Sequence, residues 1–131
     1  MKYIIMCGGN YHMDIPKHLL PVKGEPIVAR TIRLLRESGI SDIAISATDD
    51  RFEQFGVPVL KHENRYGDGG LWLEGFYPMK EPACYIFGDV VFSPAAIQTI
   101  INTDTRLIKF FASSPPFPEE YTKNWAEPFA F

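Results

Sequence analysis

An apolar run over residues 2–6 leads directly into a glycine pair, Gly8 and Gly9. Glycines let the backbone approach a ligand closely, and their N–H groups can hydrogen-bond phosphate oxygens or a base edge. Lys17 follows a proline a few residues later, where its ammonium group could offset the charge of a polyphosphate. A plain tight turn and a solvated lysine are the alternatives. This order of an apolar run, a glycine pair and a lysine predicts a nucleotide-binding loop. Lys17 is its predicted catalytic residue, and the predicted nucleotide contacts are Cys7, Gly8, Gly9 and Asn10.

A carboxylate stands at the end of a second apolar run, in the order Phe87-Gly88-Asp89. A side chain in this place lies at the edge of a sheet where ligands bind. Carboxylate oxygens suit Mg²⁺, which also bridges phosphates. We therefore predict that Asp89 binds Mg²⁺, against the alternative that it only caps a turn.

Weaker patterns supply further candidates. Lys23 is a second cation for the nucleotide, and Gly69 and Gly70 end a polar, glycine-rich stretch over residues 62–70 that we interpret as a second active loop. Glu127, a late carboxylate, is a candidate for metal or acceptor contact. The histidines lack the spacing of a zinc site, and we assign Arg30 and Arg33 to a solvated helix face.

The elements that must position these groups alternate along the chain. The pattern predicts strands at 2–7, 43–47, 58–61, 83–87, 107–112 and 125–131, and helices at 26–38, 71–77 and 94–102, with a helical turn at 49–55. Pro26 opens the first long helix, Gly39 ends it, and its apolar stripe runs through Ile27, Ala29 or Arg30, Leu34 and Leu35. Ser93 caps the third helix.

Alternation of this kind predicts parallel β-α-β units with helices on both faces of the sheet. In such sheets the ligand lies beyond the carboxyl ends of the strands. The loops 8–24, 62–70 and 88–93 all leave from that edge, which brings the candidate residues to one side of the molecule.

Bulk properties narrow the class of protein. A length of 131 residues supports one domain, 1–131. A net charge of −3 argues against a nucleic-acid partner, which usually selects a basic face. No leader peptide and no membrane-spanning run is predicted. Cys7 and Cys84 stand in apolar stretches, which favours buried reduced thiols and a cytoplasmic location. The sequence leaves the oligomeric state open.

The segment from Cys7 to Ile27, with Ile15-Pro16-Lys17-His18-Leu19-Leu20-Pro21-Val22 at its centre, resembles the opening signature of nucleotidyltransferases that activate sugar 1-phosphates and similar phosphomonoesters. That signature is a glycine-rich loop followed by Pro-Lys-x-Leu-Leu-Pro-Val-x-Gly-x-Pro-Ile. Phe87-Gly88-Asp89 is similar to the Gly-Asp metal strand of the family. Residues 63–66 (Glu-Asn-Arg-Tyr) lie where relatives acting on choline phosphate or pyrimidine nucleotides carry Asn-x-x-Tyr.

The resemblance implies a three-layer α/β/α Rossmann-like domain with a mostly parallel mixed sheet, of the nucleotide-diphospho-sugar transferase type. It implies a Mg²⁺-dependent enzyme that transfers a nucleoside monophosphate from an NTP, with CTP or UTP favoured, to a sugar 1-phosphate or similar acceptor. Pyrophosphate is released by in-line attack, and no covalent intermediate forms. The Gly8–Gly9 backbone then contacts the nucleotide, Lys17 a phosphate and Asp89 the metal.

Two departures from the family pattern keep other functions open. Met13 stands where the family loop carries an arginine, and a thioether cannot replace a bidentate guanidinium. Family members also continue further, so we expect either a shortened chain or a minimal relative. The alternative function is a non-catalytic nucleotide- or sugar-nucleotide-binding domain. A glycosyltransferase ranks lowest because no Asp-x-Asp motif begins at Asp89.

Overall fold

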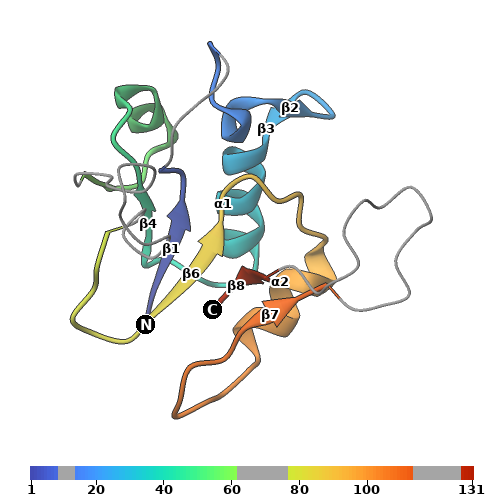
Figure 1. Ribbon diagram of the computed structural model, residues 1–131. Helices are drawn as coiled ribbons and strands as arrows, with labels where there is room; N and C mark the ends of the chain where they lie inside the picture. The colour runs from blue at the N-terminus through green and yellow to red at the C-terminus, as the bar shows by residue number, and fades with distance from the viewer. Residues whose placement is uncertain (9–13, 62–76, 114–127) are drawn as a thin grey trace.

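The computed structural model describes residues 1–8, 14–61, 77–113 and 128–131 (Figure 1). Within these residues the main sheet has six strands, in the order β5-β4-β1-β6-β8-β7. The strands are β1 (Lys2–Met6), β4 (Ile43–Ser46), β5 (Val59–Leu60), β6 (Ala83–Phe87), β7 (Phe111–Ala112) and β8 (Pro128–Ala130). Strands β5, β4, β1 and β6 pair in parallel, whereas β8 runs antiparallel to both of its neighbours. The predicted Rossmann-like α/β fold with a mostly parallel mixed sheet is confirmed.

The central strand β1 is paired along both edges, to β4 and to β6. Ile4 and Ile5 on it are fully buried, as expected for consecutive apolar residues in a parallel strand. The chain passes from β1 outward to β4 and β5, then returns to the other side of β1 as β6. The strand order therefore reverses between β1 and β6, and open α/β sheets bind ligands outside the carboxyl ends at such a point.

Two α-helices lie within the described residues, α1 (Ile27–Glu37) and α2 (Pro94–Ile101). The hydrophobic core lies between both helices and one face of the sheet, and Gln98 of α2 donates to the Ser38 hydroxyl at the end of α1 at 2.7 Å. Of the helix predicted over 71–77, only Tyr77 lies within the described residues, and it is not helical. The Tyr77 backbone N–H donates to the Ser46 hydroxyl at 2.7 Å, and the Tyr85 hydroxyl donates to the Tyr77 carbonyl at 3.0 Å.

The ends of both helices follow the sequence closely. Gly39 has φ +84°. Its N–H donates to the Arg36 carbonyl, and the Ile40 N–H donates to the Leu35 carbonyl, each at 3.0 Å. These two bonds form a Schellman motif. The Ser93 hydroxyl accepts from the Ala96 N–H at 3.1 Å and caps α2. The buried stripe of α1 includes Ile27, Leu34 and Leu35 as predicted. Between them it runs through Val28, Thr31 and Ile32 rather than through Ala29 or Arg30.

The segment predicted as one loop over 8–24 contains structure that the sequence analysis missed. A 3₁₀ turn, η1 (Lys17–Leu19), is followed by a hairpin of β2 (Pro21–Val22) and β3 (Glu25–Pro26). Lys23 and Gly24 form its tip with φ values of 52° and 80°. Positive φ at both central residues is typical of the tight turns that join two-residue hairpins. In Figure 1 the tip points away from the main sheet.

Two other predictions agree in part. The helical turn predicted over 49–55 is confirmed as η2 (Asp50–Phe55). The strand predicted over 107–112 pairs only at Phe111 and Ala112, where β8 lies beside it. Leu107, Ile108 and Phe110 are instead exposed, at 83%, 78% and 58%. Strand β8 covers part of the predicted strand at 125–131, whose residues 125–127 lie outside the described range.

Candidate functional site

The turns that follow β1 and β6 meet at the carboxyl edge of the sheet. Met6 pairs with Phe87 at the ends of the two strands, and the Gly88 N–H donates to the Met6 carbonyl at 2.9 Å. On the other side, the Cys7 N–H donates to the Ser46 carbonyl of β4 at 2.8 Å. The backbone continuing into Gly8 and that continuing into Asp89 are thus fixed next to each other.

Gly88 is the residue that makes this approach possible. A Cβ atom at this position would lie 2.6 Å from the Cys7 Sγ, 2.6 Å from the Met6 carbonyl oxygen and 3.0 Å from the His18 Cδ2. Such distances are shorter than real Cβ contacts, so only glycine fits. Gly88 therefore lets the β6 turn pack directly on the β1 turn and places the next residue, Asp89, beside the loop that carries Lys17.

Lys17 and Asp89 form an ion pair between the Nζ and Oδ2 atoms. Lys17 begins η1 directly after Pro16, whose ring is fully buried, and the Leu19 N–H closes the turn on the Pro16 carbonyl at 2.9 Å. The Lys17 side chain is 59% exposed and that of Asp89 27% exposed, so both charged groups are accessible to a ligand. The structure thus brings together the two charged candidates that the sequence placed 72 positions apart (89 − 17).

Cys7 lies beneath this edge rather than on it. Its N–H is used within the sheet, and its side chain is fully buried. Burial raises the pKa of the Cys7 thiol well above its ordinary value, and the charge of Asp89 adds to the effect. A neutral buried thiol is not a nucleophile. Gly8, the described member of the glycine pair, is half-buried and is the more accessible part of the turn.

The imidazole of His18 packs under the ion pair, a place that the sequence analysis did not predict. Only 3% of the residue is exposed, and its ring meets that of Phe52 edge-on with centroids 5.8 Å apart. Burial lowers the pKa of His18 from 6.5 to about 4, while the nearby Asp89 raises it and Lys17 lowers it to a smaller extent. The ring is therefore neutral at pH 7 and acts as packing between η1, η2 and Gly88.

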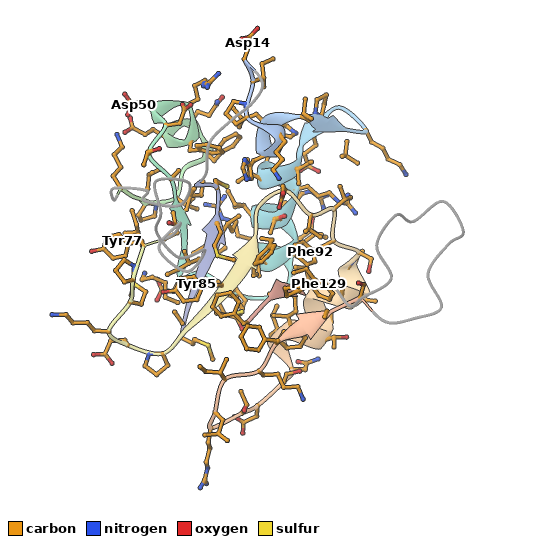
Figure 2. All side chains as sticks on the ribbon, in the orientation of Figure 1. Asp14, Asp50, Tyr77, Tyr85, Phe92 and Phe129 are labelled. Carbon is orange, nitrogen blue, oxygen red and sulfur yellow. The ribbon has the colours of Figure 1, made fainter. Side chains whose placement is uncertain are left out.

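The far end of the Asp89 loop is held by α1. Arg30 donates through Nε and Nη2 to the Phe92 carbonyl, both at 3.3 Å. The buried Phe92 ring also meets Phe129 of β8, with centroids 5.8 Å apart (Figure 2). The assignment of Arg30 to a solvated helix face is wrong, because this half-buried side chain tethers the loop. Arg33 likewise forms a bidentate pair with Glu25 of β3, at 2.9 Å for each bond.

A third guanidinium, that of Arg51 in η2, contacts the segment that precedes η1 at Asp14. Arg51 donates from Nη1 to the Asp14 carbonyl at 2.8 Å and is held by the Asp49 carboxylate, with a shortest distance of 2.6 Å. Hydrogen bonds from Arg51 lower the pKa of Asp49. Asp14, at this end of the loop, is labelled in Figure 2. Arg51 thus fixes residue 14 relative to the end of β4.

Of the remaining predicted residues, Lys23 is the one that the structure describes. Lys23 lies at the hairpin tip and makes no ion pair with the residues that the structure describes. The other candidates lie outside the described ranges and stay predictions: Gly9, Asn10, Gly69, Gly70 and Glu127.

Asp89 fits a hard divalent cation. It presents an accessible carboxylate at the ligand edge, and a cationic group, the Lys17 ammonium, already contacts it. Among the described residues, no cluster of three or more His, Cys, Asp or Glu side chains could enclose a metal. Mg²⁺ keeps several of its waters and is commonly bound by one or two carboxylates together with substrate phosphates, so one protein carboxylate suits it.

A family model described as a MobA-like NTP transferase domain matches residues 3–104. The match takes in most of the chain and includes the β1 turn, Lys17 and Asp89. No curated protein matches the sequence. In the part of the chain that the structure describes, no helix has the length and apolar character needed to cross a membrane.

Proposed function

The chain belongs to the MobA-like NTP transferase family, and from that premise we propose that it transfers a nucleoside monophosphate from CTP or UTP to a sugar 1-phosphate or similar phosphomonoester. The observation that carries the proposal is the contact of Lys17 with Asp89 at the switch point between β1 and β6. The site offers one charge of each sign where the sheet topology favours a ligand. The preference for CTP or UTP rests on the resemblance of residues 63–66 alone.

In the proposed reaction, an acceptor phosphate oxygen attacks the α-phosphorus of the NTP in line. A new oxygen–phosphorus bond forms, the bond to the β-phosphate oxygen breaks, and its electron pair leaves with pyrophosphate. Lys17 offsets phosphate charge, and the Gly8 backbone lies where the nucleotide enters. The chemistry needs positioning and charge stabilisation rather than a protein nucleophile, consistent with the buried thiol of Cys7.

We propose that Asp89 holds Mg²⁺, with Glu127 as a candidate for a further metal or acceptor contact. When bound, such an ion neutralises and orients the phosphates. Asp89 is suited to this role because Gly88 and Arg30 hold the two ends of its loop, so the carboxylate is placed before any ligand arrives.

The test is pyrophosphate release from each NTP, with Mg²⁺ and a panel of sugar 1-phosphates and choline phosphate. We expect release with at least one combination and its loss in Asp89→Asn. Asp42→Asn is the matched control, because Asp42 also pairs with a lysine, Lys2, at the opposite end of β1. Equal rates in the wild type and in Asp89→Asn would contradict the proposed site.

Met13 favours a second candidate function, a non-catalytic nucleotide- or sugar-nucleotide-binding domain, since the family signature has an arginine there. Calorimetry with the same NTPs separates the two functions. Binding without pyrophosphate release from any pair of substrates would support the binding domain. A cytoplasmic location is proposed for either function, because both cysteines are buried in the apolar core.

A further inference from the structure

Lys17 and Asp89 carry opposite charges that the proposed function directs to different partners. In the structure the two groups neutralise each other. In the proposed complex the ammonium faces a phosphate and the carboxylate faces a metal ion. The pair uses the Lys17 Nζ and Asp89 Oδ2 atoms, so the ammonium and a metal ion bound at that oxygen compete for it, and metal binding there opens the ion pair.

We propose that Lys17 acts as an internal counter-ion that occupies Asp89 until a metal–polyphosphate complex arrives and exchanges partners with both residues. This inference rests on the proposed function. It makes Lys17 a competitor of the free metal ion as well as a ligand of the phosphate. The metal then enters together with the polyphosphate rather than before it.

The surroundings of the two residues allow such an exchange. Lys17 is 59% exposed and has a flexible four-carbon stem, while its backbone is fixed between the buried Pro16 and His18. The ammonium group can therefore move without moving η1. Asp89 follows Gly88, whose N–H is held by the Met6 carbonyl at 2.9 Å. An ion pair this exposed contributes little stability, so its opening costs little.

The donor set gives an independent reason for joint entry. Within the described residues, Asp89 belongs to no group of three or more His, Cys, Asp or Glu side chains that could hold a metal. A single carboxylate that is already paired holds a free divalent ion weakly. A metal ion that arrives with phosphate oxygens brings further ligands with it, and its phosphates offer Lys17 a new partner at the same moment.

The experiment follows Mn²⁺ alone by paramagnetic broadening of the Gly8 and Gly88 amide signals in ¹⁵N-labelled protein. In Lys17→Met we expect Mn²⁺ to bind about two- to fivefold more tightly, because the competing ammonium is gone. Lys17→Arg keeps the charge and should stay near the wild-type affinity. Lys2→Met is the matched control, since it removes another lysine–aspartate pair from the far end of β1 and should change nothing at Gly8 or Gly88.

A second titration uses inorganic tripolyphosphate with Mg²⁺, which probes the phosphate contacts without a base. Here Lys17→Met should bind about tenfold more weakly, because a charged hydrogen bond is lost. Opposite effects of one substitution on the two probes would support the exchange. Unchanged or weaker Mn²⁺ binding in Lys17→Met would overturn it. If Mn²⁺ still broadened the Gly8 and Gly88 signals in Asp89→Asn, Asp89 would not be the metal ligand. That result would refute the proposed function on which the exchange rests.

Discussion

Gly88→Ala is the substitution that tests the geometry of the site most directly. The added methyl group would lie 2.6 Å from both the Cys7 Sγ and the Met6 carbonyl oxygen, about 1 Å inside an ordinary contact. The Met6 carbonyl belongs to the central strand and accepts the Gly88 N–H at 2.9 Å. Relief of the clash therefore has to separate the β6 turn from the β1 turn.

We expect a loss of about 2–3 kcal/mol in the free energy of unfolding, the usual cost of overpacking a rigid site. For a domain of this size the melting temperature should fall by roughly 6–15 °C. Urea denaturation and thermal scans of the metal-free protein measure both quantities. Mn²⁺ broadening at Gly8 should also weaken, because Asp89 moves with the displaced turn.

Gly56→Ala is the control for backbone strain. Gly56 has φ +66° and open space around its missing Cβ, so alanine there should cost only about 1 kcal/mol. In the double variant Cys7→Ala/Gly88→Ala, removal of the Sγ contact should recover part of the loss, while the Met6 contact remains. A Gly88→Ala protein no less stable than Gly56→Ala would refute the close approach of the two turns.

Three further predictions address neighbouring residues. His18 has a pKa of about 4 in the fold against 6.5 in the unfolded chain, so below pH 6.5 the unfolded chain binds a proton that the fold does not. The free energy of unfolding should therefore be highest above pH 6.5 and fall by roughly 3 kcal/mol as the pH is lowered towards 4. Urea titrations in EDTA measure this slope, which His18→Asn should lack. Lys17→Ala should lower kcat more than it raises KM if the ammonium acts mainly in the transition state, and steady-state pyrophosphate assays decide this. Arg30→Met removes the two bonds to the Phe92 carbonyl and should speed amide hydrogen exchange in residues 89–93 by about tenfold, whereas Arg36→Met, which loses a bond to Gly56, should leave that loop unchanged.

Local sequence signals predicted the elements that frame the site. Apolar runs set β1 and β6, and the Gly39 and Ser93 signals placed the ends of the helices, because these depend on neighbouring residues alone. The hairpin of β2 and β3 was missed because its strands have two residues each, and a lysine with positive φ leaves no distinctive pattern.

The sequence placed Lys17 and Asp89 at one edge of the sheet, but other contacts across the fold could not be predicted from it. Arg30 reaches a carbonyl 62 positions away, and nothing in its helical neighbourhood distinguishes it from a solvated arginine. The burial of His18 depends on Phe52 and on the space left by Gly88. The place of β8 between β6 and β7 likewise depends on long-range pairing and has no local signal.

These long-range contacts give the two charges of the site different freedom. The loop that carries Asp89 is fixed at one end by the Gly88 N–H on β1 and at the other by Arg30 on the Phe92 carbonyl. Lys17 has a fixed backbone but an exposed, flexible side chain. A preorganised carboxylate avoids reorganisation when a metal binds, while a mobile ammonium group can follow a phosphate. The fold therefore separates the two properties that the proposed metal-assisted transfer needs, and substitutions that free Asp89 should impair that transfer even where Lys17 is intact.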